Sequence, residues 1–299
     1  MDRTSLIRVT GLAGAIAVAA VSVTAAASAS ASPAPSRPAA APAAAAPTTA
    51  VPIRLRDFGT DNITDIAVWR PSNGTWYFRG GKSVQYGQAG DIPVAADYNH
   101  DNVNEIAVFR PSNGTWYIRG EKSVHYGQAG DIPLPGSYTT PGIQIALYRP
   151  SNGTWYIRGQ KSVLYGSPGD QPQPLNYDLS GLTNIGIFRP SDGTWHVRGK
   201  SPITYGQSGD TPVPHNYKTG GVRVAVYRSG VWHMRGLAAV SYGTSTDLPA
   251  PGNWGHGNQI ASFRPSDGTW HIRGQGSIQY GQKGDVPVLS LIHISEPTD

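Results

Sequence analysis

The sequence predicts an all-β protein, a β-propeller whose six blades each contain four antiparallel strands, with a seventh blade expected in the untruncated protein. One unit recurs six times along the 299 residues, and its first-strand arginines lie 40, 39, 40, 39 and 36 residues apart. A period of this length is typical of propellers and solenoids. The 37 glycines and 25 prolines favour many turns between short strands, and the units show no helical period. The recurring arginines are Arg70, Arg110, Arg149, Arg189, Arg228 and Arg264.

Residues 1–31 have the features of a secretory signal peptide. Arg3 and Arg8 precede an apolar run over 11–23, and small residues at 27–31 offer a cleavage site. The run is shorter than the roughly 20 residues that a membrane-spanning helix needs. We therefore expect a secreted or cell-surface protein with no membrane span after cleavage; an uncleaved anchor is the alternative.

Residues 32–52 are rich in alanine and proline and show no apolar period. Such a segment favours an extended, semi-rigid linker. The chain contains no cysteine, which excludes disulfides, thiol catalysis and cysteine-based zinc sites. The domain over 53–288 must therefore be stabilised by burial of its core.

The second unit shows how a blade is built. A strand over 105–110 is followed by Pro-Ser-Asn-Gly, whose Asn-Gly pair favours a tight turn, and by a returning strand over 115–119. A third strand is expected over 123–126, and a fourth over 132–138 leads into the next unit. Four antiparallel strands make up one propeller blade.

Both faces of each sheet carry bulky side chains. Trp116 and Ile118 point to one face, and Tyr117 and Arg119 to the other, because side chains alternate along a strand. Stacking the blades around a ring covers both faces, whereas a β-solenoid, the alternative, uses shorter rungs. The tryptophan that recurs at one strand position is expected in the core between blades. The six are Trp76, Trp116, Trp155, Trp195, Trp232 and Trp270.

The unit PVAADYNHDNVNEIAVFRPSNGTWYIRG (93–120) resembles the FG-GAP or VCBS-type repeat of bacterial exported proteins, which is related in blade design to the integrin α-chain head. The resemblance covers about residues 51–288. It implies a seven-bladed propeller used for adhesion, ligand display or as an accessory domain, with calcium in loops between strands.

The best candidate metal site lies in the loop that leads from the inner strand of a blade to the strand before its tight turn. In the second unit, oxygen-bearing side chains alternate and end in an acid eight residues after the first, a pattern that suits Ca²⁺. These residues are Asp97, Asn99, Asp101 and Glu105. The first unit offers a weaker version with Asp57, Asp61 and Asp65. The other four loops have lost most of these acids, and simple Asx turns are the alternative for all of them.

The charge pattern argues against nucleic acid as a partner, although the sequence pI is about 9.4. Of the 21 lysines and arginines over 54–288, 12 are two recurrent strand arginines of the six units. We expect them to be distributed around the ring, with one set paired to a recurrent aspartate across blades.

Catalytic signatures are missing from the sequence. Glutamate occurs only at 105, 121 and 296, and there is neither a Gly-x-Ser-x-Gly elbow nor an HExxH motif. The sequence therefore predicts a monomeric, non-catalytic binding or scaffold module with an extracellular protein or glycan ligand. A carbohydrate-binding accessory domain of a larger, truncated secreted enzyme is the alternative, with recurrent tyrosines such as Tyr86 and Tyr126 as stacking platforms.

The repeat pattern stops near the end of the chain. Residues 284–288 begin like the innermost strand of a seventh blade, but the tail LSLIHISEPTD over 289–299 matches none of the other transitions. It looks like the translation of a sequencing-library adapter, so we expect an artefact and a truncated gene. A natural tail on a six-bladed ring is the alternative.

Overall fold

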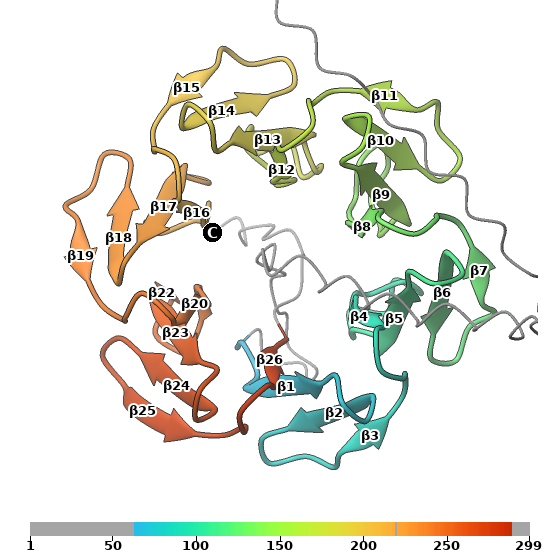
Figure 1. Cartoon of the computed structure of the whole chain (residues 1–299), viewed down its shortest axis with the longest axis horizontal. Coiled ribbons are helices and arrows are strands. Elements are labelled where there is room, and N and C mark those ends of the chain that lie inside the picture. The colour runs from blue at the N-terminus through green and yellow to red at the C-terminus, as the bar shows by residue number, and fades with distance from the viewer. Residues whose placement is uncertain (1–62, 219, 289–299) are drawn as a thin grey trace, which may run out of the picture. The chain divides into compact units, whose positions relative to one another are not determined.

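The computed structural model describes residues 63–218 and 220–288 (Figure 1). By internal contacts the chain divides into units over 1–45 and 46–299, and every described residue belongs to the second. The predicted signal peptide, linker and C-terminal tail all lie outside the described residues.

Two four-residue strands form the centre of every blade. The tight turn between them contains an Asn-Gly or Asp-Gly pair in five blades. In the fifth blade along the chain the turn is shorter and consists of Ser-Gly. The strand before the turn is β1 (Ala67–Arg70), β5 (Ala107–Arg110), β9 (Ala146–Arg149), β13 (Gly186–Arg189), β17 (Ala225–Arg228) or β23 (Ala261–Arg264). The strand after it is β2 (Thr75–Phe78), β6 (Thr115–Ile118), β10 (Thr154–Ile157), β14 (Thr194–Val197), β18 (Val231–Met234) or β24 (Thr269–Ile272).

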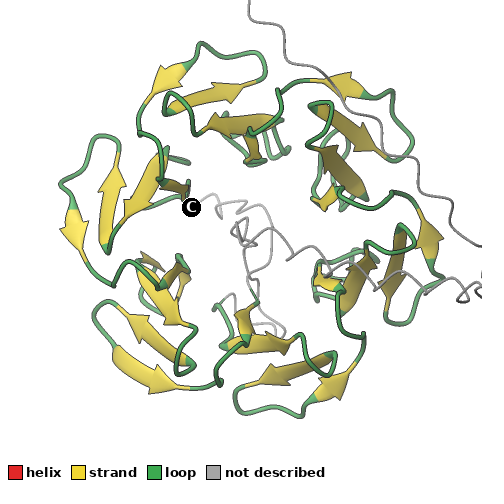
Figure 2. Cartoon of the chain, in the orientation of Figure 1, coloured by secondary structure: helices red, strands yellow, loops and turns green. Residues whose placement is uncertain are grey.

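An innermost and an outermost strand complete each antiparallel sheet, and no described residue is helical (Figure 2). The innermost strands are β26 (Val286–Pro287), β4 (Ile92–Pro93), β8 (Ile132–Pro133), β12 (Gln171–Pro172), β16 (Thr211–Pro212) and β20 (Leu248–Pro249). Each contains a proline, which is tolerated because the strand has a free edge toward the ring centre. The outermost are β3 (Val84–Gln85), β7 (Val124–His125), β11 (Val163–Leu164), β15 (Ile203–Thr204), β19 (Val240–Ser241) and β25 (Gly276–Gln279). A short hairpin, β21 (Gly252–Asn253) with β22 (Asn258–Gln259), is added in the sixth blade.

These six sheets are arranged as a propeller, which confirms the predicted fold class (Figure 1). Blades 1 to 6 are numbered here from the sheet that holds β1. Since the described residues include no helix, they also include none long and apolar enough to cross a membrane.

The recurrent tryptophan lies in the core between neighbouring blades, as predicted. All six of these side chains are at most 1% exposed, and each indole Nε1 donates a hydrogen bond to the backbone oxygen of the tyrosine after the outermost strand. An unpaired N–H would add a desolvation cost to the burial of the indole. The bond therefore ties the third strand of a blade to its fourth.

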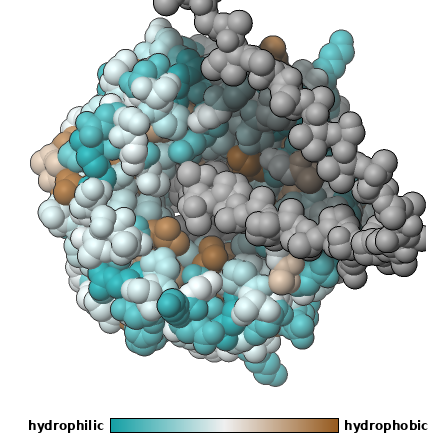
Figure 3. Space-filling view, in the orientation of Figure 1, coloured by the Kyte–Doolittle hydropathy of each residue, from teal (hydrophilic) through white to brown (hydrophobic). Residues whose placement is uncertain are grey.

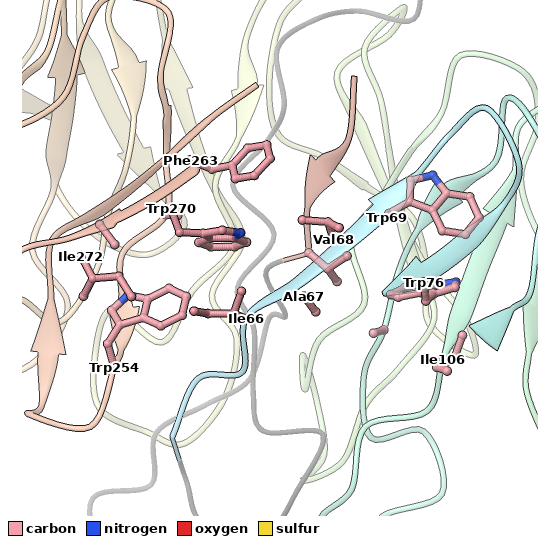
Figure 4. Close-up of a cluster of buried hydrophobic side chains, with 14 of the residues drawn as sticks. Ile66, Ala67, Val68, Trp69, Trp76, Ile106, Trp254, Phe263, Trp270 and Ile272 are labelled. Atoms are coloured by element: carbon pink, nitrogen blue, oxygen red, sulfur yellow. The ribbon is translucent and has the colours of Figure 1, made fainter. Parts of the chain in front are cut away.

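The last innermost strand closes the ring. The sequence predicted that residues 284–288 would open a seventh blade, but β26 pairs with β1 and is the innermost strand of blade 1. That prediction is wrong because residues at the end of the last repeat supply the innermost strand of blade 1. The apolar cluster is continuous across this junction, where Ile66 of blade 1 lies beside Trp254 and Trp270 of blade 6 (Figure 4).

An arginine–aspartate pair fastens the innermost strand to the second strand in every blade. The guanidinium Nε and Nη2 donate to the two carboxylate oxygens, at 2.8 and 2.9 Å for Arg110 and Asp91. The two partners lie in one sheet although they come from different sequence units, so pairing across blades was a wrong prediction. The pairs are Arg70–Asp285, Arg110–Asp91, Arg149–Asp131, Arg189–Asp170, Arg228–Asp210 and Arg264–Asp247.

Antiparallel order places successive connections at opposite ends of a blade, so the ring has two different faces. We call one the loop face: it carries the long loop after each innermost strand and the turn between the third and fourth strands. The other is the turn face, which carries the tight turns, the connections between blades and the arginine–aspartate pairs.

Candidate functional site

The 97–105 loop on the loop face is the candidate metal site. It connects β4 to β5, and a backbone bridge between Ala96 and Glu105 closes its base. Tyr98 anchors it from below, because the phenol donates to the Val94 carbonyl at 2.6 Å. His100 and Asn102 have left-handed backbone conformations, with φ of 66° and 69°, which fold the loop back on itself.

Three carboxylates converge inside this loop. One oxygen from each of Asp97, Asp101 and Glu105 lies within 4.8 Å of the others, as the predicted spacing requires. Asn99 joins them, since its amide donates to Asp101 at 3.1 Å and its Oδ1 accepts from the Asp101 N–H at 2.9 Å. The four residues predicted to hold a cation therefore lie together.

Backbone N–H groups already hold each carboxylate in place. Asp97 accepts from the N–H groups of Asp101 and Asn102, both at 3.0 Å, and Glu105 accepts from Tyr98 at 2.7 Å and Asn99 at 3.3 Å. A carboxylate oxygen has two lone pairs, so each keeps acceptor capacity for a cation. The carboxylate positions are therefore fixed by the loop itself.

The loop carries negative charge that no described cation neutralises. None of the ion pairs among the described residues involves these three acids. Burial raises the pKa of Glu105; the two backbone hydrogen bonds oppose that rise, and the charges of Asp101 and Asp97 add to it. A bound cation would relieve this cost of ionisation.

The same loop in other blades is closed in the same way without the three acids. Gln144 of blade 3 and Asn184 of blade 4 stand in the place of Glu105. Their side-chain oxygens accept from the N–H of the tyrosine near the start of the loop, Tyr138 and Tyr177, at 3.0 and 2.7 Å. A neutral side chain thus suffices to close the loop. The three acids of blade 2 go beyond what the Asx-turn alternative requires.

The predicted site in the first unit lies mostly outside the described residues. Of its three candidates, Asp57 and Asp61 lie outside the described residues, and only Asp65 is placed. Asp65 lines a cavity of about 700 Å³ on the loop face together with Arg79, Glu105 and Arg119. This cavity adjoins the 97–105 loop through Glu105.

The recurrent tyrosines are partly buried rather than freely exposed. Tyr86 and Tyr126 each lie beside a blade boundary, and burial is the main cause that raises their pKa, opposed by a nearby arginine. His196, His233 and His271 occupy the strand position of Tyr77, one to a blade, so they do not converge on one metal.

The two recurrent arginines of a unit, which the sequence pattern did not distinguish, lie in different environments. The first of each unit is paired on the turn face, whereas the second follows the third strand and lies exposed on the loop face. Successive connections of an antiparallel blade lie at its opposite ends. The position of each arginine at the end of its strand could therefore have assigned the two sets to opposite faces.

Comparisons with known proteins found few similarities. No family model matches the chain, and no curated protein matches it. Among solved structures, the crystal structure of BBS1N in complex with ARL6DN matches with 14% sequence identity and a TM-score of 0.41. The match covers 63% of this chain and 66% of that one, just under two thirds of its length.

Proposed function

We propose that the chain is an exported, non-catalytic binding or scaffold propeller of the FG-GAP or VCBS type, with Ca²⁺ bound in the 97–105 loop. The observation that carries the calcium assignment is the convergence of three carboxylates without a counter-ion. Asp97, Asp101 and Glu105 supply oxygen ligands, which Ca²⁺ prefers, and Asn99 adds an amide oxygen. The ion would hold the loop rigid at the edge of the cavity between blades 1 and 2.

The use of the carboxylates supports binding rather than catalysis. Six aspartates are committed to bidentate arginine pairs on the turn face, and three more acids gather in the 97–105 loop. Hydrolytic pairs need two carboxylates in different environments across one cleft. The partly buried tyrosines give little support to the alternative of sugar stacking.

Thermal unfolding with and without calcium tests this proposal. An ion that binds only the folded state at about 100 times its Kd stabilises it by about 2.7 kcal/mol, which raises the Tm of a domain this size by about 5–10 °C. Asp97→Asn with Asp101→Asn should abolish the rise while keeping hydrogen-bond acceptors in place. Asp178→Asn in the corresponding loop of blade 4 is the control and should leave the rise unchanged.

A gain of function makes the test stricter. Asn176→Asp, Ser180→Asp and Asn184→Glu would give the blade 4 loop the acids of blade 2 and should enlarge the calcium-dependent rise in Tm. No rise in the unmutated protein would remove calcium from the proposed function.

A further inference from the structure

Charge is divided unequally between the two faces of the ring. Among the described residues, the loop face carries twelve lysines and arginines against six acids, whereas the turn face carries seven against eight. Each face carries one set of six recurrent arginines, but only the turn-face set is matched by a set of recurrent aspartates. The loop-face set is Arg79, Arg119, Arg158, Arg198, Arg235 and Arg273.

In the part of the chain that the structure describes, the loop-face arginines are exposed and unpaired. In the described structure none of their six guanidiniums makes a hydrogen bond or an ion pair with a side chain, in contrast to the six paired arginines of the turn face. An exposed guanidinium offers planar donors that fit carboxylate, sulfate and phosphate groups. These positions are therefore available to an anionic partner.

The positive charge is concentrated on one side of that face. Blades 1 and 2 carry four of the cations and five of the described acids, including the 97–105 loop. Blades 3 to 6 carry the other eight cations and a single acid, Asp178. We call the loop face of blades 3 to 6 the basic arc. Its lysines are Lys161, Lys200 and Lys218.

We infer that the basic arc binds a linear anionic glycan, a polysaccharide with a carboxylate or sulfate group on its repeating sugars. The blades place one loop-face arginine after another at a regular interval around the ring, which suits a polymer whose charges also recur. Several weak ion pairs made together give useful affinity, although each exposed pair contributes little.

The surface chemistry favours a glycan over a protein. Protein interfaces depend on aromatic or apolar side chains at their centre. The described residues expose only three large hydrophobic side chains, Ile63, Leu164 and Leu179. The face seen in Figure 3 is accordingly mostly hydrophilic or neutral, with only scattered apolar groups.

Nucleic acid fits less well. Single strands bind by stacking their bases on exposed aromatic rings, and the recurrent tryptophans are buried. Preference for a glycan over double-stranded nucleic acid rests on the proposed export, which brings the chain to extracellular polysaccharide. The experiment below separates these partners.

Binding of fluorescein-labelled polymers to the purified chain tests the inference. Alginate and dextran sulfate should bind at about 50 mM salt and lose at least about tenfold in affinity by about 500 mM, because salt screens exposed charges. Neutral dextran should not bind. Equal binding of neutral dextran, or equal or tighter binding of a DNA duplex, would overturn the assignment.

Matched variants separate the basic arc from net charge. Arg158→Gln, Arg198→Gln and Arg273→Gln together should weaken glycan binding by about tenfold or more. Ser151→Glu, Ser191→Glu and Ser266→Glu change net charge equally from exposed turn-face positions of the same blades, and should weaken binding by about twofold at most. Equal weakening in both, or no weakening in the arginine variant, contradicts the inference.

Two further readouts keep the outcome interpretable. Circular dichroism and the Tm establish that both variants are folded. The calcium-dependent rise in Tm is measured on the same samples: if it persists without glycan binding, only this inference fails, and if glycan binding depends on the basic arc without that rise, only the calcium assignment fails.

Discussion

The position before the paired arginine shows how one residue adapts the repeat. It is Trp69 in blade 1, phenylalanine in blades 2, 4 and 6, and tyrosine in blades 3 and 5, and the ring packs against the core tryptophan in each. Tyr148 and Tyr227 must also place a hydroxyl, which donates to the backbone oxygens of Ser167 and Thr244 at 3.3 and 2.6 Å. Burial, followed by the charge of a nearby aspartate, raises the pKa of both tyrosines to about 12.

Replacing these two tyrosines by phenylalanine should change how stability depends on pH. Because the folded pKa lies above the ordinary value of about 10, the tyrosines favour folding below pH 10 and lose that contribution as the pH rises through 12. At pH 7 the double variant should be less stable by about 1 kcal/mol for each lost hydrogen bond. Urea unfolding at about pH 7 and pH 11 should show this difference shrinking at the higher pH. A difference that stays constant would contradict the assignment.

At the scale of the element, the tight turns depend on glycine. The six turn glycines have φ between 64° and 87°, as the Asn-Gly and Asp-Gly pairs predicted. Space as well as backbone conformation requires glycine at Gly114, because a Cβ there would collide with the carbonyl of Gly127. At Gly130, in the connection to the next blade, φ is 86° but a Cβ would meet nothing within 4 Å.

These two glycines separate strain from collision. Gly130→Ala should cost about 1 kcal/mol, from the left-handed conformation alone. Gly114→Ala should cost about 3 kcal/mol or more, because the turn must also move away from its neighbour. Urea unfolding of the two variants provides the measurement, and equal losses of stability would show that the turn relaxes freely.

The repeat pattern predicted the strands of a blade better than the direction of its side chains. Strand 115–118 and its tight turn follow from local residues such as Asn113 and Gly114. The face of the ring on which Arg119 lies depends on which end of the blade its strand reaches, and that is a property of the whole sheet. For the same reason, the 97–105 loop could be predicted from its own acids, whereas the basic arc required all six blades to be placed.

At the scale of the whole molecule, closure of the ring depends on a strand that the repeat pattern had assigned to a seventh blade. Residues 286–287 are indistinguishable in pattern from the five other innermost strands, and a periodic sequence does not say which unit ends beside the first. In the structure Asp285 reaches Arg70, 215 positions away, at 2.8 Å. Closure thus depends on a long-range pairing, which the sequence period leaves open.

Ending the chain at Gly281 should therefore open the ring, whereas ending it at Val288 should keep it closed. Loss of β26 removes the backbone pairing with β1 and the carboxylate that holds the Arg70 guanidinium. It also exposes the β1 edge and part of the cluster around Ile66, so the Tm should fall by about 10 °C or more. The Val288 variant retains the whole described closure and is the matched control. Calorimetry and small-angle scattering provide the measurements; an equal Tm and an equal radius of gyration for the two would mean that β26 does not hold the ring together.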